Sequence, residues 1–354
     1  MELPLNQVLC GDNREILPTL PCGSVDLCVT SPPYWGLRDY GHEDQLGLEA
    51  HPQLYVDHLV EICREVKRVI KPKGSFWLNL GDSYFSSTRG SGGSPNNQGI
   101  GGAHAQHFDS IKITEKSNWL QPKQKLMIPE RTAMALQDDG WILRNSVIWY
   151  KPNHMPESVR DRLTKSYEFF FFFVKSRKYY FDLDSIREPT TSQPWTNTSN
   201  KEPYQNNNPR KYVGKYDPNV AETVSSPRAR QATRDITSYY NPLGKNPGDM
   251  WTVNTQPFPG SHFAVFPPEL IEPIIKSSSP PNGIVLDPFA GSGTALRVAR
   301  KLGRQFIGIE LNPEYAAMCE QRVRADTYTK PPENVPKLTE YTRTKLSLCV
   351  EESE

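Results

Sequence analysis

Residues 284–294 read IVLDPFAGSGT, an apolar run that ends in Asp287 and is followed by a turn with two glycines. The apolar run predicts a buried strand, and the spacing after it predicts a helix over 295–302. Glycines in such a turn let the backbone approach a ligand closely, and an acid at the strand end can hold a polar group beside it. The stretch therefore predicts one corner of an α/β fold with a ligand site.

A second acid strengthens this interpretation. The next apolar segment, 305–309, ends in Glu310, which lies 23 positions after Asp287. In a nucleotide-like site, an acid at the end of the second strand accepts hydrogen bonds from ribose hydroxyls. The alternative is a plain strand, turn and helix with a solvated acid. These residues alone do not identify the ligand.

The stretch TSPPYW, residues 30–35, follows another apolar strand, 26–30. Its two prolines fix the backbone and supply no N–H donor, so the turn presents carbonyl oxygens and the Ser31 hydroxyl as acceptors. Tyr34 adds a flat surface for stacking. These groups suit a planar ring that carries an exocyclic amine. A rigid proline turn over the core is the alternative for this segment taken alone.

Apolar periodicity places further helices and strands between these two motifs. The strands predicted at 168–174 and 178–181 are separated by a turn at Ser176-Arg177 and are expected to form an antiparallel hairpin. The predicted helices cover 53–70 and 128–137, and the predicted strands cover 75–80, 145–150, 168–174 and 178–181.

Two segments break this pattern. Within 86–118, six of the thirteen residues from Gly90 to Gly102 are glycine, which predicts a flexible loop. Residues 186–260 are rich in Asn, Pro, Ser, Thr and Tyr and hold nine Lys and Arg against six Asp and Glu. This composition predicts a loop-rich insert whose polar surface contacts a partner.

Charge and composition exclude several classes. The 354 residues include 41 Lys and Arg against 40 Asp and Glu, which excludes a uniformly basic surface but leaves a basic groove open. No signal peptide and no membrane-spanning run are found, so the cytoplasm is the expected location. His104 and His107 lack neighbouring carboxylates or cysteines, so no metal site is predicted.

Together, these segments resemble the amino-directed DNA methyltransferases, which use S-adenosylmethionine to methylate N4 of cytosine or N6 of adenine. Residues 287–294 resemble the cofactor motif of that family, and residues 30–34 resemble its catalytic motif. The catalytic motif comes first, 256 positions before the cofactor motif (Ser31 to Asp287), which is the permuted order of the β class. The resemblance covers roughly residues 7–85, 126–185 and 260–325.

The resemblance implies a Rossmann-like α/β fold with a mostly parallel seven-stranded sheet, an antiparallel hairpin, a permuted motif order and a loop-rich recognition insert. It further implies that the turn at Asp12 binds the adenine amino group of the cofactor and that 263–270 lines its methionine end. The implied catalytic residues are Ser31, Pro32, Pro33 and Tyr34, and the implied cofactor-binding residues are Asp12, Phe263, Phe266, Asp287, Phe289, Gly291, Ser292, Gly293, Thr294 and Glu310.

Under the same resemblance, the substrate is double-stranded DNA, and the insert is the region that reads its sequence. A homodimer and a cognate restriction endonuclease are open as further partners, and the location is a prokaryotic cytoplasm or nucleoid. Predicted DNA contacts, in the insert and outside it, are Arg38, Lys151, Asn153, Arg160, Arg210, Lys211, Arg228, Arg230 and Arg234.

Ser31, where many relatives have Asp or Asn, favours cytosine N4 over adenine N6. An adenine N6 enzyme, an RNA or protein amide methyltransferase and an inactive DNA binder are the alternatives. Pro21-Cys22 matches the dipeptide of cytosine C5 enzymes only superficially, because Cys22 precedes its strand.

The predicted domains follow from the motif positions. They are a catalytic half at 1–185 that includes the loop 86–118, a recognition insert at 186–260, a cofactor half at 261–330 and a tail at 331–354.

Overall fold

The computed structural model of this chain describes residues 2–36, 44–85, 120–189, 241, 243–256 and 265–325. The chain divides into two compact units, Met1–Ser185 with Gly248–Glu354, and Ile186–Pro247. In the second unit, the described residues include an antiparallel bridge between Glu188 and Lys245. The predicted loop 86–118 and most of the predicted insert lie outside the described residues.

The first unit contains strands and helices where the periodicity predicts them, except at 178–181, and it has two further strands, β1 and β6, that were not predicted. In chain order the elements are β1 (Gln7–Cys10), α1 (Asn13–Ile16), η1 (Leu17–Thr19), β2 (Val25–Thr30), α2 (Pro52–Val69), β3 (Ile70–Leu80), α3 (Ile128–Asp138), β4 (Ile142–Tyr150), β5 (Tyr167–Val174), η3 (Asp184–Ile186, reaching into the second unit), β6 (Met250–Thr252), α5 (Pro268–Ser278), β7 (Ile284–Asp287), α6 (Thr294–Lys301), β8 (Gln305–Glu310) and α7 (Pro313–Ala325).

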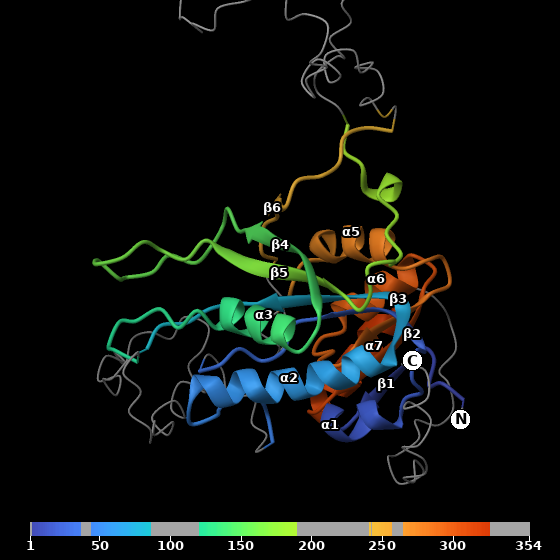
Figure 1. Cartoon of the computed structure of the whole chain (residues 1–354), viewed down its shortest axis with the longest axis horizontal. Coiled ribbons are helices and arrows are strands. Elements are labelled where there is room, and N and C mark those ends of the chain that lie inside the picture. Colours follow the sequence, from blue (N-terminus) through green and yellow to red (C-terminus); the bar gives the residue numbers. More distant parts are fainter. Residues whose placement is uncertain are drawn as a thin grey trace, which may run out of the picture. The chain divides into compact units, whose positions relative to one another are not determined.

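One sheet organises the first unit (Figure 1). Its strand order is β1-β8-β7-β2-β3-β5-β4-β6. The five strands from β1 to β3 are mutually parallel, whereas β5 runs antiparallel to both β3 and β4. The predicted mixed α/β fold is confirmed. The sheet has eight strands where seven were expected, because the short β6 pairs with the outer edge of β4.

The predicted hairpin of 168–174 with 178–181 is wrong, since 178–181 forms no strand. Both edges of β5 are already paired, one with β3 and one with β4, so no edge is left for a third strand. The chain instead crosses the end of the sheet, where the Tyr180 N–H donates to the Lys73 carbonyl at 2.8 Å. The antiparallel hairpin is formed by β4 and β5.

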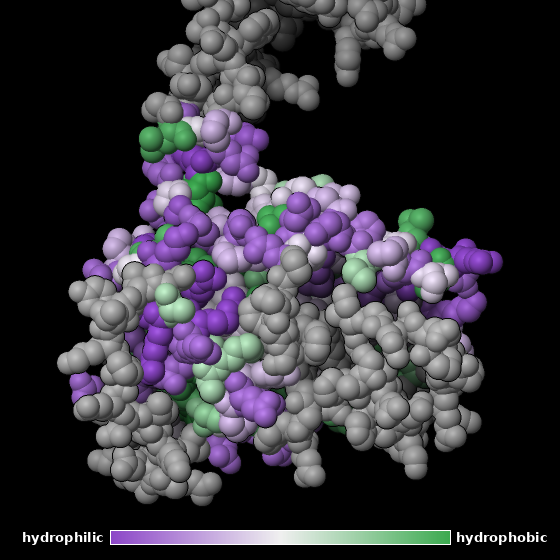
Figure 2. Space-filling model, turned by 180° about the vertical axis from the view of Figure 1, so that it is seen from behind, coloured by the Kyte–Doolittle hydropathy of each residue, from purple (hydrophilic) through white to green (hydrophobic). Residues whose placement is uncertain are grey.

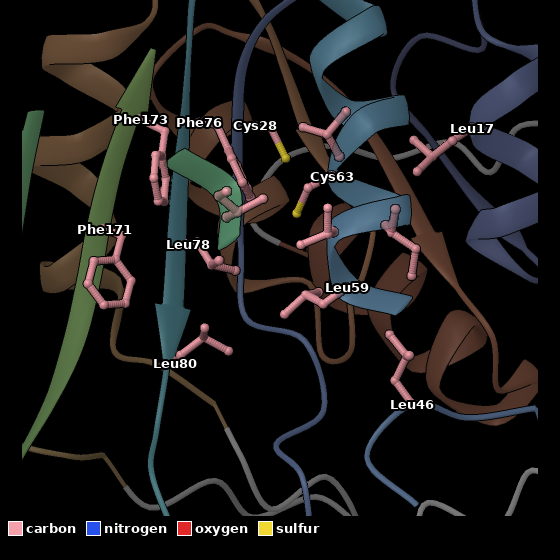
Figure 3. Packing of buried hydrophobic residues seen from close by; sticks show 14 of the residues in the cluster. Leu17, Cys28, Leu46, Leu59, Cys63, Phe76, Leu78, Leu80, Phe171 and Phe173 are labelled. Carbon is pink, nitrogen blue, oxygen red and sulfur yellow. The ribbon is translucent and has the colours of Figure 1, made fainter. Parts of the chain in front are cut away.

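Helices cover both faces of the sheet. Helices α1, α2 and α3 pack on one face, and α5, α6 and α7 pack on the other. Strand side chains alternate between the two layers, so Phe171 and Phe173 of β5 enter the first core while Phe170 and Phe172 enter the second. Figure 3 shows side chains of β3, β5 and α2 meeting in the first core. Each fully buried Phe contributes about 1.5–3 kcal/mol.

The outer surface differs from these two cores. Figure 2 shows mostly hydrophilic residues on the described part of one face, with hydrophobic residues scattered among them. Among the described helices, none combines the length and the apolar character that crossing a bilayer needs.

Candidate active site

The two predicted motifs leave the sheet from neighbouring strands. β2 and β7 pair in parallel through Leu27 with Val285 and Cys28 with Leu286. At their carboxyl ends, the Thr30 hydroxyl donates a buried 2.6 Å hydrogen bond to Oδ1 of Asp287. The proline turn (residues 31–34) and the glycine turn (residues 288–293) therefore begin side by side. They lie at the carboxyl-terminal edge of the sheet, where ligands of parallel sheets bind.

Asp287 is an acid in an almost water-free position, with 2% of its surface exposed. Loss of solvation raises its pKa to about 7, against the opposing effect of hydrogen bonds from the Thr30 hydroxyl and the Phe289 N–H. The Phe289 N–H donates to Oδ1 at 3.1 Å. The nearby Glu310 raises this pKa further. Burial is therefore the main reason that the pKa of Asp287 is high.

Glu310 ends β8 and faces the glycine turn. Its Oε2 accepts the Gly291 N–H at 2.7 Å and its Oε1 accepts the Asn312 N–H at 3.0 Å. Burial raises the pKa of Glu310, and these backbone donors oppose the rise. Among the described residues, the buried Thr294 Oγ1 at the start of α6 has no hydrogen-bond partner. Two acids and a hydroxyl therefore surround this turn.

Gly293 is required for the shape of the turn. Its φ is +77°, and a Cβ there would lie 2.5 Å from Sγ of Cys319 on α7. The Ser292 carbonyl accepts a hydrogen bond from the Arg322 guanidinium, also on α7. Phe289 is half-buried against the first core. The turn is consequently fixed by direct packing on α7.

Asp12 lies one strand further along the same edge, because the Gly11 N–H donates to the Glu310 carbonyl at 2.9 Å. Its side chain caps α1 and pairs with the Arg14 guanidinium at 2.5 Å. Phe266 packs against the second core. The structure brings these predicted cofactor residues to one edge, while Phe263 lies outside the described residues.

At the proline turn, Ser31 and Tyr34 contact each other. The Ser31 hydroxyl donates to Tyr34 Oη at 3.3 Å. Tyr34 Oη in turn lies 2.9 Å from Oδ1 of Asn79 and 3.0 Å from Oε2 of Glu168. Burial and then the charge of Glu168 raise the pKa of Tyr34 well above its usual value. Tyr34 is therefore a neutral phenol in this site.

Three further contacts hold this turn in place. The Tyr55 hydroxyl of α2 donates to the Pro33 carbonyl at 2.9 Å. The Tyr34 ring lies so close to Gly81 that a Cβ there would be 2.5 Å from its Cε2. The Gly36 N–H donates to the Gly47 carbonyl at 2.8 Å. The acceptors of the turn are thereby presented from a fixed backbone.

Asn79 and Glu168 were missed from sequence. Asn79 is a buried polar residue at the end of β3, and its Nδ2 donates to the Phe169 carbonyl at 2.9 Å. Glu168, on β5, pairs with the ammonium of Lys151, which also lies 4.0 Å from the centroid of the Trp149 ring. The available signals were one polar residue within the apolar run 75–80 and one acid at the start of a phenylalanine run.

The predicted DNA contacts fall in several places. Lys151 lies in the ion pair with Glu168, and Asn153 exchanges two hydrogen bonds with the backbone of Thr255, at 2.8 and 2.9 Å. Arg160 is exposed in the connection between β4 and β5, which extends beyond the sheet (Figure 1). Contact with DNA stays a prediction for all three. The other predicted contacts, Arg38, Arg210, Lys211, Arg228, Arg230 and Arg234, lie outside the described residues.

Within the described residues, no group of three or more His, Cys, Asp or Glu side chains is arranged to hold a metal ion.

Comparison with known proteins gives consistent matches along the chain. The family model of the N6/N4 methyltransferases, described as DNA methylase, matches residues 25–321. The Type II methyltransferase M.XycI of Xanthomonas campestris pv. cyanopsidis is 41% identical over 89% of this chain and 86% of its own length. M.Cfr9I of Citrobacter freundii is 40% identical over 89% and 87%.

Solved structures share the fold. The PvuII DNA methyltransferase, described as cytosine-N4-specific, superposes with a TM-score of 0.55 at 18% identity, over 89% of this chain and 85% of its own. A Thermus thermophilus protein assigned as a DNA modification methylase and solved with S-adenosyl-L-methionine gives 0.51 at 23% identity, over 91% and 94%. The likeness confirms the Rossmann-like fold predicted above.

Proposed function

This chain belongs to the N6/N4 DNA methylase family, and we propose that it transfers a methyl group from S-adenosyl-L-methionine to the exocyclic N4 amine of cytosine in duplex DNA. It is a Type II DNA methyltransferase by its relatives. The single observation that carries the proposal is the hydrogen bond from Thr30 to Asp287, because it joins the amine-binding turn to the glycine turn. The donor and the acceptor of a methyl group need that proximity.

The residues around the glycine turn fit S-adenosyl-L-methionine. Glu310 provides a carboxylate at the end of the second strand, suited to ribose hydroxyls. Thr294 provides a buried hydroxyl without a partner among the described residues, and Asp12 provides a carboxylate one strand away. When bound, the cofactor supplies an electrophilic methyl group on a sulfonium.

The amine is held by the proline turn. Ser31 Oγ has lone pairs for an amine N–H, since its own proton is directed toward Tyr34. Orientation of the amine moves its lone pair out of conjugation with the ring and toward the methyl group. A base in a duplex cannot reach this turn, so the target is flipped out at a cost of a few kcal/mol.

Cytosine is proposed over adenine because residue 31 is serine. In the family that this chain resembles, the Ser-Pro-Pro-Tyr form usually accompanies N4 activity, and forms with Asp or Asn usually accompany N6 activity. An adenine N6 enzyme with the same cofactor chemistry is the second candidate.

Methylation of a plasmid by the purified protein, followed by modified-base sequencing, tests the proposal. We expect N4-methylcytosine at one short sequence. N6-methyladenine would overturn the choice of base and keep the family. Transfer of a tritiated methyl group to RNA or protein alone, or cofactor binding with no transfer, would overturn the DNA substrate.

The roles of the two turns are separable. Ser31→Ala should reduce transfer by at least about 100-fold, because an acceptor of the reacting amine is lost, while cofactor affinity stays within about twofold. Glu310→Ala should weaken cofactor binding about tenfold or more in calorimetry. Equal loss of both properties in both variants would contradict the assignment.

The proposal extends to organisation and partners. Residues 186–260 are proposed to read the DNA sequence, between a catalytic half at 1–185 and a cofactor half at 261–330. A homodimer, a cognate restriction endonuclease and a place of action in the cytoplasm or nucleoid belong to the same proposal. Sedimentation of the protein with and without its duplex checks the dimer.

A further inference from the structure

Glu168 is an acid next to the proline turn, and the function proposed above gives it no role. It lies at the start of β5, and its side chain is only 20% exposed. One carboxylate oxygen pairs with the Lys151 ammonium, and the other lies 3.0 Å from Tyr34 Oη. A charge this deep needs partners, and the Lys151 ammonium is one of them. The second oxygen is therefore a strong acceptor aimed at Tyr34.

Asn79 is the competing acceptor for the Tyr34 proton. Its Oδ1 lies 2.9 Å from Tyr34 Oη, and its Nδ2 donates to the Phe169 carbonyl, which fixes the orientation of the amide. A phenol has one proton and can donate it to only one acceptor at a time. Hydrogen bonds to a charged acceptor are roughly twice as strong as neutral ones, so the carboxylate of Glu168 is favoured.

The hydrogen bonds consequently run in one direction. Because Tyr34 donates to Glu168, its Oη can only accept from Ser31. Because Ser31 donates its proton to Tyr34, its lone pairs are left for the amine. The carboxylate of Glu168, at the end of this series of hydrogen bonds, therefore makes Ser31 an acceptor for the amine.

We propose that Glu168 is a positioning residue at the end of a hydrogen-bond relay, Ser31 to Tyr34 to Glu168, that orients the target amine and receives its proton. The inference rests on the proposed function and deepens it. Glu168 thereby supplies a negative charge that Ser31 itself does not carry.

The proton step balances within the relay. After the amine nitrogen has gained the methyl group, one of its N–H bonds breaks and the proton goes to Ser31 Oγ. The Ser31 proton moves to Tyr34 Oη, and the Tyr34 proton moves to Glu168 Oε2. The product amine is neutral, Glu168 is a carboxylic acid, and loss of its proton to water restores the site.

Glu168→Gln is the central variant, because it keeps the shape and removes the charge. We expect kcat to fall about 100-fold, the typical size of a general acid-base contribution, with cofactor affinity within about twofold. Glu65→Gln is the matched control. It removes an acid on helix α2 that is also ion-paired, with Arg68 at 2.7 Å, and that lies in neither turn. It should leave kcat unchanged.

A double-mutant cycle tests whether Glu168 acts through Tyr34. Tyr34→Phe removes the hydroxyl and keeps the ring. If the relay is correct, adding Glu168→Gln to Tyr34→Phe reduces kcat by less than about twofold more. Multiplicative losses would overturn the relay.

A comparison of kcat with KM separates the relay from a structural role. The groups that face Glu168 among the described residues are the Lys151 ammonium from the end of β4, the Tyr34 phenol and the neutral Asn79 from β3. Because Glu168 acts on the amine through Tyr34, Glu168→Gln should lower kcat and leave the KM for DNA within about twofold. A loss confined to KM would overturn the proposal.

A spectroscopic readout needs no catalysis. In protein labelled with 13C at tyrosine Cζ, Tyr34 is assigned by the resonance missing in Tyr34→Phe. The Tyr34 hydroxyl lies 3.0 Å from Glu168 Oε2, and loss of this charged acceptor should shift the Cζ resonance of Tyr34 in Glu168→Gln and leave it in place in Glu65→Gln. An unchanged Tyr34 resonance refutes the relay even if no DNA is methylated. Absence of transfer by the wild-type protein would refute only the proposed function.

Discussion

The Thr30 hydroxyl and the Asp287 carboxylate lie 2.6 Å apart although 257 positions separate them in the chain. The contact is buried and joins the carboxyl ends of two paired strands. It links two turns that lie far apart in the sequence and that follow paired strands. The proposed cofactor and amine sites both lie beside this pair.

Asp287→Asn should remove a pH dependence of stability. The pKa of Asp287 in the folded protein, about 7, lies above its ordinary value of 3.8. The folded state therefore binds this proton more tightly, and the stabilisation is complete below about pH 4 and lost as pH rises through 7. The change amounts to about 4 kcal/mol.

Urea unfolding at pH 5 and pH 8 measures this effect. The free energy of unfolding of Asp287→Asn minus that of the wild-type protein should be more positive at pH 8 than at pH 5. Thr30→Val serves as a second test, since it removes a hydrogen bond that lowers the pKa of Asp287. Equal wild-type-to-variant differences at both pH values would contradict the assignment.

Gly293→Ala should destabilise the glycine turn by two separate effects. The left-handed φ of +77° costs about 1 kcal/mol for alanine, and the new Cβ would collide with Cys319 Sγ at 2.5 Å. Gly303→Ala is the control, because Gly303 has a φ of +70° and nothing within 4 Å of the new Cβ. We expect a loss of about 1 kcal/mol at 303 and at least about 2 kcal/mol more at 293.

Calorimetry with S-adenosyl-L-methionine complements these stabilities. Gly293→Ala should weaken binding because α7 has to move away from the turn, and Gly303→Ala should bind as the wild type does. Equal stabilities of the two variants would show that α7 yields without cost.

Gly81→Ala should act on the reaction through Tyr34. Its Cβ would lie 2.5 Å from Tyr34 Cε2, so the ring has to turn away from Glu168. We expect a fall in kcat of about tenfold or more with cofactor affinity preserved. Gly248→Ala has open space around its new Cβ and is the matched control. Wild-type kcat in Gly81→Ala would show that the ring position is unimportant.

The salt dependence of DNA binding distinguishes two of the predicted contacts. If Arg160 contacts a phosphate, Arg160→Gln weakens binding and reduces the slope of log K against log salt by about 1. Asn153→Ala loses three hydrogen bonds with Thr255 and should cost about 1 kcal/mol of stability with the slope unchanged. Anisotropy with a labelled duplex at several salt concentrations measures both slopes.

The sequence was sufficient for the parts of the fold and site that local patterns determine. Both motifs follow strands, and the carboxyl ends of parallel strands share an edge of the sheet, so the proximity of the two turns could be predicted. The strand pairing of β5 could not, because a run of five phenylalanines is apolar on both faces and carries no period-two signal.

The same limit hid Asn79 and Glu168. Their proximity depends on the antiparallel register of β3 with β5, in which Asn79 pairs with Phe170 and Leu80 with Phe169. A shift of one residue would send these side chains to opposite faces. β6, with three residues, was too short for any periodicity. Long-range register, which local sequence does not encode, accounts for the missed proximity of Asn79 and Glu168, and short length accounts for the missed β6.

β1 and β8 are the first and last strands in the amino-acid sequence, and they pair with each other at one side of the sheet. During translation the proline turn leaves the ribosome with the first part of the chain, whereas Glu310 follows after most of it has been made. At about 5–20 residues per second, that interval lasts roughly 15 to 60 s. A nascent chain therefore lacks Glu310 beside the glycine turn until its synthesis is nearly finished, and the two turns of the candidate site are complete only then.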